Sequence, residues 1–137
     1  MIIQLPNLIK FFRYWFPLIT YCILIFLQSS FPPIESVPEL PYSDKVLHFI
    51  AYAILGALFF RAYSSLQVSK HLNALIILSV LSSSLYGISD EIHQYFVPYR
   101  NFSYFDILAD MLGSLFGVFI YQFIMRKQIV KRFNFLN

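Results

Sequence analysis

Charged side chains are scarce in this sequence. They make up 12% of its 137 residues, whereas 58% of the residues are hydrophobic. A soluble domain usually carries about 25% charged residues, so this chain has too few to cover a surface that faces water. The composition therefore excludes an ordinary soluble domain and favours a membrane protein surrounded by a lipid bilayer. The net charge of +3 comes from basic residues that flank apolar runs, which indicates membrane orientation and no nucleic-acid partner.

Cysteine pairs and the common catalytic signatures are also missing. Cys22 is the single cysteine, so no disulfide can form within the chain, and its apolar neighbours favour a packing role over redox chemistry. The sequence contains no G-x-S-x-G nucleophile elbow, no H-E-x-x-H zinc motif and no glycine-rich phosphate loop. The enzyme classes that depend on those motifs are therefore excluded.

Four apolar runs are long enough to cross a membrane, at about 20 residues per crossing. They cover residues 14–31, 45–63, 72–88 and 104–125. These runs predict an all-α, polytopic four-helix bundle with short loops, forming one domain over residues 1–137. The first run follows two basic residues, as in a secretory signal peptide, but no small-x-small cleavage site follows it, so we expect an uncleaved span. We expect residues 1–12 to lie along the membrane interface.

Polar segments separate the runs. Three prolines and two glutamates in residues 34–43 predict a loop, and Ser43 and Asp44 predict the N-cap and first turn of the second span. Residues 90–103 are expected to form another polar loop on the same side of the membrane, in which His93 is solvated.

Basic residues divide unequally between the two sides of this predicted topology. Eight of the ten fall at the N-terminus, the middle loop and the C-terminus: Lys10, Arg13, Arg61, Lys70, Arg126, Lys127, Lys131 and Arg132. Only Lys45 and Arg100 fall on the opposite side. The positive-inside rule therefore predicts that both termini are cytoplasmic. All the acids fall in the other, extracytoplasmic half: Glu35, Glu39, Asp44, Asp90, Glu91, Asp106 and Asp110. Because acids contribute little to orientation, their segregation indicates a site.

Polar residues recur at helical spacing at the outer ends of three predicted spans. The stripes are Asp44, His48 and Tyr52 in the second span, Gly87, Glu91 and Gln94 in the third, and Asp106, Asp110, Gly113 and Gly117 in the fourth. Glycines four residues apart favour close helix contact, so the acids that precede them are expected to face a neighbouring helix. The three helix ends are then expected to converge on one polar basin, joined by Lys45, Asp90 and Arg100.

Several of these residues also have a purely architectural interpretation. Arg100 would pair with Glu91 or Asp106 and close its loop onto the bundle, while Asp44 and Lys45 would be interfacial residues whose charged ends reach water. Against this, five acids and two bases leave three carboxylates without a cationic partner. Those carboxylates must be protonated, hydrated, or bound to a cation or a positively charged ligand.

Two longer motifs lie over the second to fourth predicted spans. They are DKVLHFIAY at residues 44–52, followed by Gly56, and GISDEIHQYFVPYRNFSYFDILADMLG at residues 87–113. Together they resemble the VanZ-like family. Two positions depart from the usual pattern, since Tyr99 stands where glycine is common and Asp110 stands where asparagine is common. The resemblance implies a bacterial cytoplasmic-membrane protein related to one associated with low-level teicoplanin resistance, and it implies no particular reaction.

Two functions fit such a basin. The first is an extracytoplasmic site that processes an envelope lipid, a lipid-linked glycan or a peptide. Lys45 and Arg100 would hold a phosphate or carboxylate of the substrate. The catalytic candidates are Glu91, Asp106, His48 and Asp90, and the ligand-binding candidates are Asp44, Lys45, Tyr52, Gln94, Arg100 and Asp110. The second function is a module that binds an envelope ligand, a glycopeptide antibiotic or a partner protein without turnover, for which the aromatic residues around Phe96 are suited.

Transport and metal chemistry are weaker interpretations. Four spans leave little room for a transport pathway, and no broken-helix repeat is visible. No cofactor and no metal ligand is assigned from the sequence. A Mg²⁺ or Ca²⁺ ion held by oxygen ligands is the less favoured alternative, and its candidate ligands are Asp90, Glu91, Asp106 and Asp110.

Overall fold

Four helices make up most of the described chain. The computed structural model describes residues 5–32, 42–66, 72–98 and 100–135. Its helices are α1 (Leu5–Ser29), α2 (Ser43–Ser64), α3 (Leu72–Tyr95) and α4 (Tyr104–Phe135), and the described residues form no strand. Each helix contains an apolar segment long enough to cross a membrane, namely Leu8–Ser29, Ser43–Ser64, Leu72–Tyr95 and Tyr104–Arg126. The predicted all-α, four-span architecture is confirmed, and the chain is a multi-pass membrane protein.

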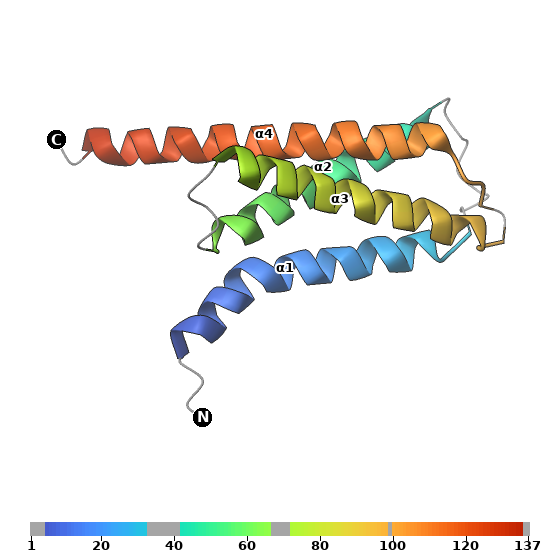
Figure 1. The fold of residues 1–137 in the computed structure, drawn as a ribbon, viewed down its shortest axis with the longest axis horizontal. Helices are drawn as coiled ribbons and strands as arrows, with labels where there is room; N and C mark the ends of the chain where they lie inside the picture. The colour runs from blue at the N-terminus through green and yellow to red at the C-terminus, as the bar shows by residue number, and fades with distance from the viewer. Residues whose placement is uncertain (1–4, 33–41, 67–71, 99, 136–137) are drawn as a thin grey trace.

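The helices run alternately up and down one long axis (Figure 1). Helices α2, α3 and α4 pack against one another, whereas α1 lies against α2 and α3 only, within the described ranges. Helix α1 bends along its length (Figure 1), and Pro17 inside it removes one backbone hydrogen bond. The bundle therefore has two ends. We call the end where α1 starts and α4 finishes the basic end, and the opposite end, where α2 and α4 start and α3 finishes, the acidic end.

Glycines bring α2 and α4 into direct backbone contact. A Cβ atom at Gly113 or Gly117 of α4 would overlap the carbonyl oxygen of Phe49 or Ala53 of α2. On α2, a Cβ atom at Gly56 would lie 2.5 Å from the carbonyl oxygen of Ser114. In a membrane, where the hydrophobic effect does not drive helices together, such close approach supplies the packing energy. The prediction that the glycine face of the last span meets a neighbouring helix is confirmed.

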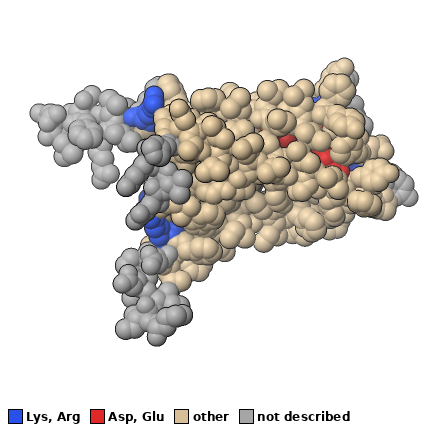
Figure 2. Space-filling model, viewed as in Figure 1, with Lys and Arg blue, Asp and Glu red and all other residues tan. Residues whose placement is uncertain are grey.

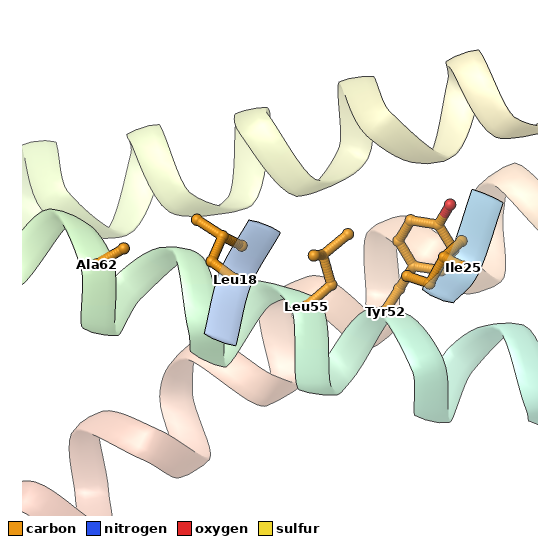
Figure 3. Packing of buried hydrophobic residues seen from close by; sticks show 5 residues of the cluster. All are labelled: Leu18, Ile25, Tyr52, Leu55 and Ala62. Carbon is orange, nitrogen blue, oxygen red and sulfur yellow. The ribbon is translucent and has the colours of Figure 1, made fainter. Parts of the chain in front are cut away.

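A small apolar core joins α1 to α2. Its buried members are Leu18, Ile25, Tyr52, Leu55 and Ala62, which lie between α1, α2 and α3 (Figure 3). Two tyrosine hydroxyls tie α1 in place, because Tyr21 donates to the carbonyl of Ala51 at 3.1 Å and Tyr86 donates to that of Cys22 at 2.6 Å. Many of the remaining large apolar side chains are exposed, as expected of helices that face lipid.

The helix boundaries differ from the predicted ones at several points. Helix α1 begins at Leu5, so residues 5–12, which are expected along the membrane interface, form its first turns, and residues 1–4 lie outside the described residues. Helix α4 continues past residue 125 to Phe135, because lysine, arginine and glutamine in that segment are good helix formers. Helix α3 continues to Tyr95, through the first part of the segment predicted as a loop, because polar side chains in its last turns are buried and bonded.

The predicted cap of α2 is wrong. The helix already includes Ser43, and the residue that precedes it is Tyr42, which has a φ of 66° and forms no side-chain capping hydrogen bond. A positive φ is uncommon for a residue with a bulky side chain. Residues 34–41, which complete the predicted loop, lie outside the described residues.

Candidate functional site

Four buried carboxylates lie at the acidic end of the bundle. They are Asp90 and Glu91 of α3 and Asp106 and Asp110 of α4, and each whole residue is at most 6% exposed. On the face drawn in Figure 2, the acids appear only as small areas near one end, and larger basic areas lie at the opposite end. Buried carboxylates of this kind need a partner, a proton or an ion. Each of the four carboxylates must therefore be matched with a partner among the groups that surround it.

His48 lies between two of these carboxylates. Its Nδ1 atom is within hydrogen-bonding distance of Oδ1 of Asp110, at 3.0 Å, and its Nε2 atom lies 3.7 Å from Oε1 of Glu91. The three residues come from α2, α4 and α3 respectively, so each helix of the three-helix core supplies one member. We call His48, Glu91 and Asp110 the imidazole–carboxylate cluster. The ends of α2, α3 and α4 meet at this point, and these three side chains lie together there.

Local features of the helices fix the cluster. Tyr52 follows His48 by one turn of α2, and the two rings are parallel with their centroids 6.3 Å apart. Gly87 faces the cluster from α3, where a Cβ atom would lie 2.7 Å from Oδ2 of Asp110 and 3.1 Å from Cε1 of Tyr52. Any larger residue at position 87 would therefore displace the carboxylate or the tyrosine ring.

The start of α4 holds the second oxygen of Glu91. The backbone N–H of Ser103 donates to Oε2 of Glu91 at 3.0 Å, while Oγ of Ser103 accepts from the N–H of Asp106 at 3.3 Å. Unpaired N–H groups and the positive end of the helix dipole favour an anion at this position. Sequence reasoning missed Ser103, although the pattern Ser-x-x-Asp just before an apolar run is a known helix-start signal.

Lys45 joins the start of α2 to the start of α4. Its Nζ atom lies 2.7 Å from Oδ2 of Asp44 and 3.1 Å from Oδ1 of Asp106. The side chain of Asp44 is 57% exposed and that of Asp106 is 9% exposed. Asp106 is thus a buried member of an ion pair, whereas Asp44 lies at the surface beside it.

Asp90 and Gln94 form a separate pair on the last turns of α3. Nε2 of Gln94 donates to Oδ2 of Asp90 at 3.0 Å, and both side chains are buried. Their spacing of four residues places them on one helical face, whereas the sequence pattern groups Gln94 with Gly87 and Glu91. Within the described ranges, the recorded ion pairs of the site do not include Asp90.

Arg100 lies against α1 instead of the acids. Its guanidinium group donates to the carbonyl of Phe31 at 3.2 Å and to that of Gln28 at 3.4 Å. The predicted architectural pairing of Arg100 with Glu91 or Asp106 is therefore wrong. The physical reason is that the last carbonyls of a helix lack partners within the helix, and a cation is favourable there.

His93 also contacts α1, although it was expected to be solvated. Its Nε2 atom lies 3.0 Å from Oγ of Ser30, and its ring packs on that of Phe26 with the centroids 4.7 Å apart. Arg100 and His93 thus attach the end of α3 and its loop to the end of α1. This connection borders the site and is distinct from the imidazole–carboxylate cluster.

Three buried polar atoms around the cluster have no hydrogen-bond partner among the described residues. They are the hydroxyl of Tyr52, Oε1 of Glu91 and Oδ2 of Asp110. More than about 90% of buried polar groups in proteins are hydrogen-bonded, so three unpaired atoms at one place require an explanation. The arrangement can hold an ion, water or a polar group of a ligand, and an imidazole oriented by a carboxylate can transfer a proton.

Comparisons with known proteins agree with the resemblance found in the motifs. The family model described as VanZ/LLP1 matches residues 4–126. An uncharacterized protein of Schizosaccharomyces pombe is 26% identical over 91 residues, which cover 66% of this chain and 54% of that protein. The chain thus spans about half the length of this curated relative. No solved structure matches.

Proposed function

We propose that this chain, which belongs to the VanZ/LLP1 family, processes an amphiphilic component of the cell envelope at its acidic end. The component would be a lipid, a lipid-linked glycan or a peptide. The observation that carries the proposal is His48 held between Asp110 at 3.0 Å and Glu91 at 3.7 Å, all within the bundle. An imidazole oriented by one carboxylate and facing another is suited to accept a proton from one group and return it to a second.

In this proposal each polar residue has a defined role. Asp110 fixes the tautomer of His48 and stabilises the imidazolium that forms when Nε2 accepts a proton. Glu91 acts as the second proton carrier, while Asp106 positions the ammonium group of Lys45. Lys45 then attracts an anionic group of the substrate, such as a phosphate or a carboxylate. Asp44 and Tyr52 act as positioning groups beside this centre, the pair of Asp90 and Gln94 supports the end of α3, and Arg100 holds the adjoining loop against α1.

The proposed location is the bacterial cytoplasmic membrane, with both termini in the cytoplasm and the acidic end outside. Support comes from the basic end, where Arg61 donates to the carbonyl of Arg13 at 2.9 Å and both guanidinium groups lie over the ring of Tyr14. Basic residues concentrate on the cytoplasmic side of membrane proteins. In a Cys22→Ser background, Asn101→Cys should react with an impermeant thiol reagent in intact cells and Leu66→Cys should not. The reverse labelling pattern would exclude this orientation.

Exposed aromatic residues support an amphiphilic substrate. Tyr95, Phe96, Tyr104 and Phe105 are between 66% and 79% exposed, and they flank the site at the end of α3 and the start of α4. Aromatic side chains prefer the level of lipid headgroups. A substrate with a polar headgroup and an apolar tail could place its head near Lys45 while its tail stays in the bilayer.

Conversion of an envelope lipid extract by purified protein in proteoliposomes tests the proposal. Products would be followed by mass spectrometry, and Glu91→Gln and Asp106→Asn should abolish the wild-type product pattern while the variants remain folded. Ser89→Ala is the matched control on α3, because its exposed hydroxyl bonds to the carbonyl of Tyr86, one turn earlier in the same helix, at 2.7 Å. If the wild type and both site variants give identical extracts, the catalytic proposal is lost.

The same exposed aromatic residues favour one second candidate, a site that binds an envelope ligand, a glycopeptide or a partner protein without turnover. That function predicts retention of a ligand by the wild type with no new product, and weaker retention by Glu91→Gln. A link to teicoplanin resistance is tested separately by expressing the wild type and Glu91→Gln in a sensitive bacterium. Equal susceptibility of the two strains would remove resistance from the proposal.

A further inference from the structure

We propose that His48, Glu91 and Asp110 bind a divalent transition-metal ion of the zinc class. One donor atom from each residue lies within 4.8 Å of the others. Donors around one such ion, bound at roughly 2.0–2.2 Å, lie about 3.0–3.5 Å apart. Nδ1 of His48 and Oδ1 of Asp110 are 3.0 Å apart, which is within that range. Oε1 of Glu91 lies 3.7 Å from the other ring nitrogen of His48, and a rotation of Glu91 toward the ion would supply the third donor.

The unpaired carboxylate oxygens provide an independent reason. Oε1 of Glu91 and Oδ2 of Asp110 have no hydrogen-bond partner among the described residues, and both side chains are 0% exposed. The other oxygen of each carboxylate is bonded, to the N–H of Ser103 and to His48 respectively. Glu91 is therefore oriented by the N–H of Ser103 while its Oε1 is left available as a ligand, and an ion that replaces the proton between Nδ1 of His48 and Oδ1 of Asp110 would bind these two atoms directly. Metal sites use such supporting hydrogen bonds to orient their ligands.

Charge at the acidic end also favours a cation. The buried acids are Asp90, Glu91, Asp106 and Asp110. Within the described part of the chain, their ion-pairing partners are Lys45, which is shared with Asp44, and His48. Because isolated buried anions are strongly unfavourable, the excess negative charge needs protons or a metal. A divalent ion between Glu91 and Asp110 would neutralise both.

The donor types select the class of ion. Imidazole nitrogen suits zinc, iron, copper and nickel, whereas Mg²⁺ and Ca²⁺ prefer oxygen ligands alone. The four-carboxylate set considered for Mg²⁺ or Ca²⁺ is divided in the structure, because Asp90 bonds to Gln94 and Asp106 pairs with Lys45. The remaining set combines one nitrogen with carboxylate oxygens. This set favours zinc-class ions over Mg²⁺.

Metal binding can be measured on the purified full-length protein in detergent, without a polyhistidine tag and after treatment with EDTA. Zn²⁺ titration by calorimetry and elemental analysis should give one ion per chain. His48→Gln and Asp110→Asn should each lower the affinity more than about tenfold, whereas Ser89→Ala should bind as the wild type does. Millimolar Mg²⁺ should not displace Zn²⁺. Absence of Zn²⁺ binding by the wild type, or unchanged affinity in both ligand variants, would overturn the proposal.

A measurement on the wild type keeps the test decisive if a ligand variant fails to fold. X-ray absorption of the Zn²⁺-loaded protein should show one imidazole nitrogen together with oxygen ligands. A shell of oxygen alone, or one that contains the sulfur of Cys22, would also overturn the proposal. The binding test does not depend on the proposed function, because binding is measured without substrate, and an ion on Nδ1 leaves Nε2 of His48 free for the proposed proton transfer. A variant that loses the product but still binds Zn²⁺, or one that loses Zn²⁺ but still forms the product, would show that the proposed function and the proposed metal site are independent.

Discussion

His48 of α2 and Asp110 of α4 are 62 residues apart in the sequence, and their side chains meet at 3.0 Å between Nδ1 and Oδ1. This contact crosses the interface between α2 and α4, where Gly113 and Gly117 of α4 meet the backbone of α2. The chemistry of the acidic end and the packing of the bundle are therefore linked. Substitutions at the site should affect stability, and substitutions at the glycines should affect the site.

Asp110→Asn should leave the fold intact. The amide oxygen can accept the same hydrogen bond from His48, and the substitution removes a buried negative charge, so the free energy of unfolding should change by less than about 1 kcal/mol. Asp110→Ala leaves Nδ1 of His48 without an acceptor and should cost about 2 kcal/mol. Reversible denaturation in mixed detergent micelles measures both. Equal destabilisation by the two variants would show that the hydrogen bond contributes nothing.

Lys45 should be coupled more strongly to Asp106 than to Asp44. Double-mutant cycles with Lys45→Met should give a coupling energy of about 1–2 kcal/mol with Asp106→Asn, because that carboxylate is buried. The cycle with Asp44→Asn should give less than about 0.5 kcal/mol, since that carboxylate is exposed and screened by solvent. Similar coupling energies in the two cycles would contradict this ranking.

Gly117→Ala should destabilise the bundle by about 2 kcal/mol or more, because the added methyl group overlaps the backbone of α2 at Ala53. Its abundance in the membrane should fall, as judged by immunoblotting. Leu112→Ala, on an exposed part of the same helix, is the control and should change stability little. Normal abundance and stability of Gly117→Ala would show that α2 and α4 can move apart to accept a methyl group without loss of stability.

Arg100→Ala should loosen α1 and leave the rest of the bundle in place. The substitution removes the hydrogen bonds to Phe31 and Gln28, which should cost about 1–2 kcal/mol. Cys22, half-buried against α2 and α3, is a native reporter and should react faster with a membrane-permeant maleimide in this variant. Arg126→Ala at the basic end is the matched control. An unchanged labelling rate would mean that Arg100 does not hold α1.

The spans and the inward-facing acids could be predicted because both depend on simple periodicities. Apolar runs of membrane length define the helices, and the spacing of Asp110, Gly113 and Gly117 places a carboxylate on the face that packs most closely. The position of α1 could not be predicted in this way. Which helix lies next to which is not encoded in the spacing of residues within one helix, so Arg100 was expected beside the acids instead of beside α1.

The contribution of Ser103 and the length of α3 were missed for another reason. Helix α3 ends later than its polarity indicates, because Asp90, Glu91 and Gln94 find partners inside the bundle. From the sequence alone, this polar segment is predicted to be a loop, because the sequence does not show which partners its side chains find in the folded bundle. The bond from the N–H of Ser103 to Glu91 depends on how one helix end meets the start of the next, which no local pattern specifies.

Because Gly56, Gly113 and Gly117 bring the backbones of α2 and α4 into direct contact, we expect these two helices to move as one rigid body. His48 and Asp110 would then keep a constant separation, while Glu91, on α3, would belong to the movable part of the site. If the site opens and closes around a ligand, we expect α3 to rotate while α2 and α4 keep their relative position. Spin-label distances from α2 to α3 should then broaden or shift on ligand addition, and those from α2 to α4 should stay sharp.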